Sequence, residues 1–181
     1  VDSVESALAA ERGGATRLEL CANLVIGGTT PGYPLFEQVK KETGLPVRTL
    51  IRPRFGDFLY TQYEHRQMLQ DIRHFAQAGA DGVVGSLNAD GTLNTEQMQE
   101  MMEAAGSCAV TMHRAFDVCA DPFEALKKSA ELGVDTILTS GQEADCLAGY
   151  GLLKKLMQLT DQSRSDSHRV TILAGAGVTS A

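Results

Sequence analysis

The sequence lacks several features that would place it in a well-marked class of protein. No apolar run approaches the roughly 20 residues of a membrane-spanning helix, and none resembles a signal peptide. Positive charge is scarce, since 16 Lys and Arg stand against 23 Asp and Glu, for a formal net charge of -7. We therefore expect no nucleic-acid surface and no membrane surface, although a local basic pocket is compatible with this charge balance.

The chain also lacks a cysteine pattern that would bind a structural metal or form a disulfide framework. Its four cysteines include no Cys-x-x-Cys pair, and they stand at Cys21, Cys108, Cys119 and Cys146. This spacing matches neither a zinc site nor a disulfide-rich fold, which favours reduced thiols in a cytosolic protein. With 43% hydrophobic and 22% charged residues, the 181 residues are typical of one globular domain with one core.

What the chain does contain is a regular alternation of strand and helix patterns. The predicted strands cover residues 17–21, 47–51, 82–87, 108–112, 136–140 and 170–173. The predicted helices cover residues 2–12, 34–41, 62–78, 94–105, 122–133 and 144–159, and a polar connection is expected over 160–168. A glycine precedes several strands, and strand starts recur roughly every 30 residues, as in a (β/α)₈ barrel.

This alternation indicates a parallel sheet within a single domain over residues 1–181. We predict a TIM-type (β/α)₈ barrel that is incomplete at both ends, with the first strand and the last helix and strand outside the chain. The alternative is a doubly wound open sheet, which requires nearly continuous apolar strands. The polar residues Glu19, Arg48 and Arg52 fall at inward-facing strand positions, and a barrel mouth accommodates them more easily.

In a barrel of this type, functional residues gather where the carboxyl ends of the strands converge. His113 follows one strand and is the predicted general acid or base, with Asp117 or Glu19 assisting. Arg52 and Arg54 follow another strand, and their planar guanidinium groups suit a carboxylate or a phosphate. The alternative for these arginines is an ion pair that only neutralises nearby carboxylates.

The predicted anion-binding set is larger than these two arginines. It comprises Arg52, Arg54, Asp57, Arg114, Ser140, Gly175 and Gly177. The two glycines form a turn before Val178 and Thr179, where a helix is expected to start. Backbone N–H groups at such a turn can hold a phosphate, and ordinary turn geometry is the alternative.

Cys21 indicates a different chemistry at the same mouth. A thiolate is a soft ligand that suits Cu(I), and Cys21 shares the inward-facing parity of Glu19. Cys119, in the loop after another strand, could approach from the same face. The alternative is a free cysteine that is simply buried.

Six motifs, in order along the chain, resemble the CutC copper homeostasis family. They are Glu-Leu-Cys at 19–21, Gly-Gly-Thr-Thr-Pro at 27–31, Ile-Arg-Pro-Arg-Phe-Gly-Asp-Phe at 51–58, His-Arg-Ala-Phe-Asp at 113–117, Leu-Thr-Ser-Gly at 138–141 and Ala-Gly-Ala-Gly-Val at 174–178. The resemblance implies a TIM-type barrel, a cytosolic homodimer or homotetramer, and Cu(I) binding with a role in copper tolerance. It also implies two copper-ligating cysteines, of which the second matches Cys21 and the first would precede Val1. Phe55 and Gln142 stand where glycine is usual or common in the family, and we expect both to alter the mouth rather than the fold.

Two functions follow from these observations. The resemblance implies a cytosolic Cu(I)-binding protein of copper homeostasis centred on Cys21. The alternative is a TIM-barrel enzyme that acts on a small phosphate- or carboxylate-bearing substrate, with His113 as its acid or base. The charged residues around the mouth favour an anion pocket over a soft copper site, so whether the protein is an enzyme stays open at this point.

Overall fold

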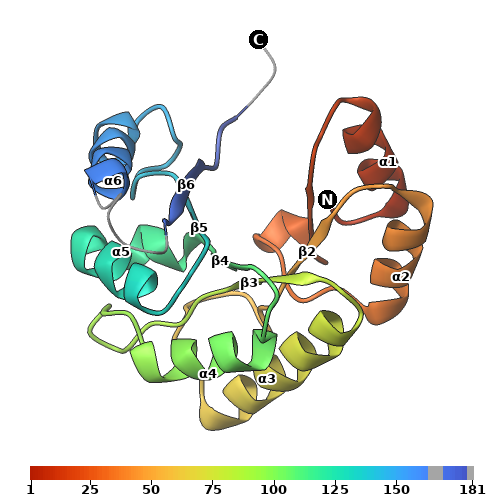
Figure 1. Ribbon diagram of the computed structural model, residues 1–181, viewed down its shortest axis with the longest axis horizontal. Helices are drawn as coiled ribbons and strands as arrows, with labels where there is room; N and C mark the ends of the chain where they lie inside the picture. The colour runs from red at the N-terminus through yellow and green to blue at the C-terminus, as the bar shows by residue number, and fades with distance from the viewer. Residues whose placement is uncertain (163–168, 179–181) are drawn as a thin grey trace.

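The structure is a computed structural model that describes residues 1–162 and 169–178, in which parallel strands alternate with helices (Figure 1). The strands are β1 (Leu18–Leu20), β2 (Val47–Leu50), β3 (Asp81–Val84), β4 (Val110–Met112), β5 (Thr136–Thr139) and β6 (Thr171–Ala174). The helices are α1 (Val4–Arg12), α2 (Tyr33–Glu42), α3 (Gln62–Gln77), α4 (Thr95–Ala105), α5 (Pro122–Glu131) and α6 (Tyr150–Gln162). Two short 3-10 helices, η1 (Leu24–Ile26) and η2 (Arg114–Val118), follow β1 and β4.

The strands pair in sequence order, β1-β2-β3-β4-β5-β6, and every pairing is parallel. Figure 1 shows the sheet curling into a half-barrel, with helices around its outside from α1 and α2 on one side to α5 and α6 on the other. A doubly wound sheet would reverse its strand order and carry helices on both faces. The predicted α/β alternation is therefore confirmed, and the open-sheet alternative is wrong.

Local signals in the sequence set the starts of several helices. Ser3 caps α1 and Thr61 caps α3, each as a capping box in which the residue three positions on returns a hydrogen bond. The Asp121 side chain accepts hydrogen bonds from the first turn of α5, where Pro122 occupies a position that needs no hydrogen bond from its nitrogen. These caps satisfy N–H groups that would otherwise have no partner within the helix.

The apolar core lies between the sheet and the surrounding helices. Met98 and Met101 of α4 are fully buried there, and Met112 of β4 accepts a hydrogen bond from Ser129 of α5. The Arg48 side chain lies on the concave side of the sheet. Its guanidinium donates there to the hydroxyl groups of Thr111 and Thr136, on two other strands. The inward-facing position predicted for Arg48 is thus confirmed.

Some predicted boundaries were wrong for local reasons. Helix α6 begins at Tyr150 rather than near residue 144, because the Asp145 carboxylate accepts hydrogen bonds from the N–H groups of Leu147 and Ala148, both at 2.9 Å, in a turn. The predicted polar connection begins inside α6, and its residues 163–168 lie outside the described residues. Thr179, where a helix start was expected, also lies outside them. Within the described residues, no helix has the length and apolar character needed to cross a membrane.

Candidate functional site

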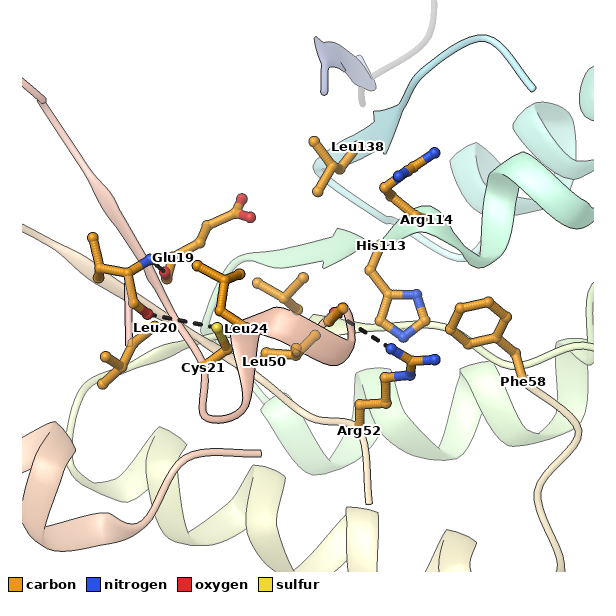
Figure 2. Close-up of a pocket in the computed structure, with 13 residues that line it drawn as sticks. Glu19, Leu20, Cys21, Leu24, Leu50, Arg52, Phe58, His113, Arg114 and Leu138 are labelled. Atoms are coloured by element: carbon orange, nitrogen blue, oxygen red, sulfur yellow. Dashed lines mark hydrogen bonds between the residues drawn. The ribbon is translucent and has the colours of Figure 1, made fainter. Parts of the chain in front are cut away.

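A cavity of about 230 Å³ lies at the carboxyl ends of the strands (Figure 2). Ligand pockets typically enclose about 300–1,000 Å³, so this one suits a small molecule. Its lining is Val1, Glu19, Leu20, Cys21, Leu24, Gly27, Leu50, Arg52, Phe58, Val83, His113, Arg114 and Leu138. The cavity therefore gathers Glu19, Cys21, Arg52, His113 and Arg114 from the predicted set, as the convergence of parallel strand ends requires.

His113 follows β4 and forms the N-cap of η2. Its Nδ1 accepts a hydrogen bond from the N–H of Ala115 at 3.1 Å, which leaves the proton of the neutral ring on Nε2. The ring packs against Phe58, with centroids 4.8 Å apart, and it is 4% exposed. Burial and the nearby positive charge of Arg52 lower the pKa of His113 to about 3. The imidazole is therefore neutral at neutral pH, and its buried Nε2 has no hydrogen-bond partner within the described residues.

Gly85 provides the space that His113 occupies. A Cβ atom at Gly85 would lie 2.7 Å from Cε1 and 2.8 Å from Nδ1 of the imidazole, well inside contact distance. A glycine at the end of a strand often marks such a close approach. This signal was present in the sequence, but the sequence did not indicate which side chain approaches Gly85.

Arg52 is buried beside His113 and joins the loops that follow β1 and β2. Its Nη1 donates to the carbonyls of Gly27 and Gly28 at 3.3 and 3.2 Å, and its Nη2 donates to the carbonyl of Gly56 at 2.8 Å. The guanidinium lies 4.9 Å from the centroid of Phe58, and its Nε is buried without a partner in the described residues. Arg52 thus binds carbonyl oxygens in place of the ion pair considered as its alternative.

Arg54 lies outside the cavity lining and does form the ion pairs considered for it. Its Nε donates to Glu64 at 2.6 Å, and its Nη2 donates to Asp57 at 2.9 Å and to the carbonyl of Leu59 at 2.9 Å. Asp57 is largely exposed. Arg54 and Asp57 both stabilise the loop after β2. Neither lines the cavity, so their predicted role in anion binding has no contact to support it.

A second polar cluster lies where β4 and β5 end. The Asp117 carboxylate accepts hydrogen bonds from Arg114 Nε at 2.7 Å, from the Thr139 hydroxyl, and from the N–H groups of Ser140 at 3.0 Å and Gln142 at 3.2 Å. Arg114 also donates to the Ser140 hydroxyl at 3.0 Å. Asp117 is buried and Arg114 is half-exposed, and of this cluster the cavity lining includes Arg114. The carboxylate oxygens of Asp117 are thus occupied by protein donors.

The glycine turn after β6 also stands apart from the cavity lining. A Cβ atom at Gly175 would lie 2.5 Å from Leu138, and one at Gly177 would lie 2.7 Å from the Cβ of Asp145. The carbonyl between them, on Ala176, accepts a hydrogen bond from the N–H of Cys146 at 3.2 Å. Close packing of this turn against its neighbours explains why both positions are glycine.

Cys21 follows β1 and lies at the cavity wall. Its Sγ is buried, donates to the carbonyl of Val1 at 3.6 Å, and has a pKa raised chiefly by burial. Val1 pairs with the edge of β1 as a further parallel strand would, since its nitrogen donates to Glu19 O at 2.8 Å and Cys21 N donates to Val1 O at 3.0 Å. Glu19 also lines the cavity, and its Oε1 has no hydrogen-bond partner among the described residues.

Cys119 does not join Cys21 in the cavity lining. Its Sγ instead accepts a hydrogen bond from the side-chain amide of Gln142 at 3.5 Å, and burial raises its pKa to about 11. Gln142, which departs from the family pattern, holds this loop with a further bond to the Cys119 carbonyl at 2.8 Å. Within residues 1–162 and 169–178, no group of three or more His, Cys, Asp or Glu side chains is placed to hold a metal ion.

The fold and the cavity together define a class: a parallel α/β half-barrel with its site at the carboxyl ends of the strands. A model of the CutC family matches residues 1–181, so the chain belongs to the CutC family and the resemblance of its motifs is confirmed. The family protein CutC of Salmonella agona (strain SL483) is 46% identical over 177 residues, which are 97% of this chain and 68% of that protein.

Solved structures share the fold. A CutC of Streptococcus agalactiae, described as a candidate copper homeostasis protein, has a TM-score of 0.90 and 28% identity, over 99% of this chain and 86% of that one. The dehydroquinate dehydratase and shikimate dehydrogenase AroM of S. pombe has a TM-score of 0.61 and 14% identity, over 95% of this chain and 34% of that one. The second likeness shows the fold alone.

Proposed function

We propose that this chain is the barrel domain of a copper homeostasis protein that binds Cu(I) through Cys21. The observation that carries the proposal is the position of Cys21, the cysteine whose thiol lines the cavity at the strand ends. The description of the Streptococcus agalactiae relative supports the same role. The proposal includes residues 1–181 as one domain of a complete TIM-type (β/α)₈ barrel, in a cytosolic homodimer or homotetramer that contributes to copper tolerance.

The chemistry of Cys21 fits one half of a Cu(I) site. Cu(I) prefers thiolate ligands, and Cys21 offers a buried sulfur that makes a long hydrogen bond to the Val1 carbonyl. Because burial raises the pKa of this thiol, binding of the metal must release its proton. A second thiol would come from the cysteine that the family resemblance places before Val1.

A Cu(I) titration against a competing chelator tests this function. We expect Cys21→Ser to weaken Cu(I) binding at least about tenfold, because a hydroxyl is a poor ligand for a soft metal. Cys119→Ser is the matched control, since it changes a buried thiol outside the cavity lining and should leave the affinity unchanged. Equal affinity of the Cys21→Ser variant and the unmodified protein would contradict copper binding at Cys21.

A second candidate function is catalysis on a small anionic substrate in the same cavity. The observation that favours it is that two buried nitrogens, His113 Nε2 and Arg52 Nε, have no hydrogen-bond partner among the residues that the structure describes. In this proposal His113 and Arg52 contact the substrate, Arg114 lies at the cavity wall, and Glu19 is the carboxylate available for proton transfer. Asp117 would position Arg114 and the loop after β5 rather than transfer a proton, since its oxygens are occupied. Turnover of a carboxylate or phosphate compound that is lost in Glu19→Gln tests it.

A further inference from the structure

We infer that His113 Nε2 and Arg52 bind the carboxylate of a small, apolar monocarboxylic acid in the cavity. This inference rests on the second candidate function, the small-anion site, and is independent of copper binding at Cys21. It names the chemical class of the ligand and gives His113 the role of a hydrogen-bond donor. Its basis is the set of residues that line the cavity and the hydrogen bonds that these residues already make.

The first step is that His113, a residue of the cavity lining, can only donate a hydrogen bond through Nε2. The backbone N–H of Ala115 occupies Nδ1, so the neutral ring carries its proton on Nε2. Arg52 beside it offers only N–H groups, and its Nη1 and Nη2 already bind carbonyls of neighbouring loops. Two donors, His113 Nε2 and Arg52 Nε, are therefore buried without an acceptor among the described residues, on two residues that both line the cavity. A buried donor without a partner costs about 1–3 kcal/mol, so a ligand oxygen that accepts from both is strongly favoured.

The second step is that the oxygen should carry negative charge. The guanidinium of Arg52 is buried, and its neighbours in the described residues are carbonyl oxygens, the face of Phe58 and the Tyr60 hydroxyl rather than a carboxylate. Figure 2 shows the imidazole of His113, the guanidinium of Arg52 and the ring of Phe58 gathered at one side of the cavity. An anion at this side would form charge-assisted hydrogen bonds, which are about twice as strong as neutral ones.

The third step is that the rest of the ligand should be apolar and carry no second negative charge. Most of the remaining wall is aliphatic, namely Leu20, Leu24, Leu50, Val83 and Leu138. Glu19 lines the wall away from His113, as Figure 2 shows, and although its Oε1 lies 3.7 Å from Arg17 Nη2, its carboxylate disfavours a second anionic group beside it. A phosphate monoester carries up to two charges, whereas a monocarboxylate with a short hydrocarbon body matches both the single cationic side and the aliphatic wall.

Binding of isovalerate to the full-length protein tests the inference, with the melting temperature and isothermal titration calorimetry as measurements. We expect isovalerate to raise the melting temperature and to bind at least about tenfold more tightly than isovaleramide, its neutral analogue of the same shape. Acetate should bind more weakly because it leaves the aliphatic wall uncovered. Inorganic phosphate should bind more weakly than isovalerate.

His113→Asn is the decisive variant. The shorter side chain can still accept the hydrogen bond from Ala115 N–H as an N-cap, but it loses the Nε2 donor. We expect isovalerate binding to fall at least about tenfold in this variant. His74→Asn makes the same change at an exposed histidine of α3 and should bind as the unmodified protein does.

Two results would overturn the inference. One is a folded, unmodified protein that binds none of these monocarboxylates. The other is equal binding of isovalerate by the unmodified protein and the His113→Asn variant. Copper binding is measured separately, with Cys21→Ser and Cys119→Ser and with Cu(I) as the ligand, so a failure of the copper proposal and a failure of this inference are told apart by different variants and different ligands.

Discussion

Two arginine-containing clusters lie at the mouth of this half-barrel, and they differ in how completely their hydrogen bonds are satisfied. Around Arg114, the carboxylate of Asp117 and the hydroxyl of Ser140 accept hydrogen bonds from the guanidinium. Backbone N–H groups donate further hydrogen bonds to the same carboxylate. Around Arg52, no carboxylate appears among the described contacts, and the neighbouring His113 Nε2 has no partner. Similar residues at one mouth therefore differ in whether they have hydrogen-bonding groups left to bind a ligand.

The difference shows which charged residues of a motif are available for binding. A carboxylate that already accepts several protein hydrogen bonds stabilises a loop, and a ligand would have to displace those donors. A buried donor without a partner gains a hydrogen bond when a ligand arrives. The motif at residues 113–117 contributes to both clusters, since His113 faces Arg52 whereas Asp117 pairs with Arg114.

The largest expected effect comes from removing the centre of the satisfied cluster. Asp117→Ala should lower the free energy of unfolding by about 3–5 kcal/mol, because it leaves several buried donors and one arginine without their acceptor. Urea-induced unfolding measures this loss. Asp57→Ala, which removes an exposed partner of Arg54, should cost less than about 1 kcal/mol. If the two variants are equally stable, the Asp117 carboxylate is not the centre of a satisfied cluster.

The next effect concerns the cluster around His113 and appears as a dependence on pH. The folded pKa of His113, about 3, lies below its ordinary value of 6.5, so the unfolded chain takes up the proton first. The free energy of unfolding is therefore not reduced by His113 above about pH 6.5. Below that pH it decreases by about 1.4 kcal/mol for each pH unit, until the folded pKa is reached.

Comparison with a variant isolates this dependence from that of the carboxylates. Urea unfolding of the unmodified protein and of His113→Asn over the range from about pH 7 to about pH 4.5 should give a shallower slope for the variant. If the free energy of unfolding has the same pH dependence in both proteins, His113 takes up its proton in the folded protein as readily as in the unfolded chain. The two clusters would then not differ as described.

The smallest of the three effects comes from Gly85→Ala. The added Cβ would lie 2.7 Å from the imidazole, so the ring must shift, at a cost of about 1–3 kcal/mol. The satisfied cluster around Asp117 should be unaffected, and monocarboxylate binding should fall because Nε2 moves. The ¹⁵N chemical shifts of the His113 imidazole, compared with those of the unmodified protein, measure this displacement. Unchanged shifts would indicate that Gly85 leaves room for a side chain.

Much of the fold could be predicted from local patterns, because local physics decides them. The alternation of strand and helix patterns and the regular spacing of strand starts were sufficient for the parallel α/β alternation. The start of α6 was missed, because the Asp145 turn competes with the helix through side-chain hydrogen bonds that an apolar pattern does not reveal. The 3-10 helices η1 and η2 were missed for a similar reason, since they are too short to leave a periodic signal.

The candidate site, like the fold, could be predicted only in part from the sequence. By itself, the sequence determined that Glu19, Cys21, Arg52 and His113 lie in or directly after strands of one parallel sheet, and parallel strand ends must meet at one edge. Only the tertiary structure decided which of these side chains are occupied. Arg54 is held by Glu64 and Asp117 by residues after β5, whereas His113 Nε2 is buried beside Arg52 without an acceptor in the described residues. The physical reason is that hydrogen-bond partners distant in sequence are chosen by packing, and no local pattern records that choice.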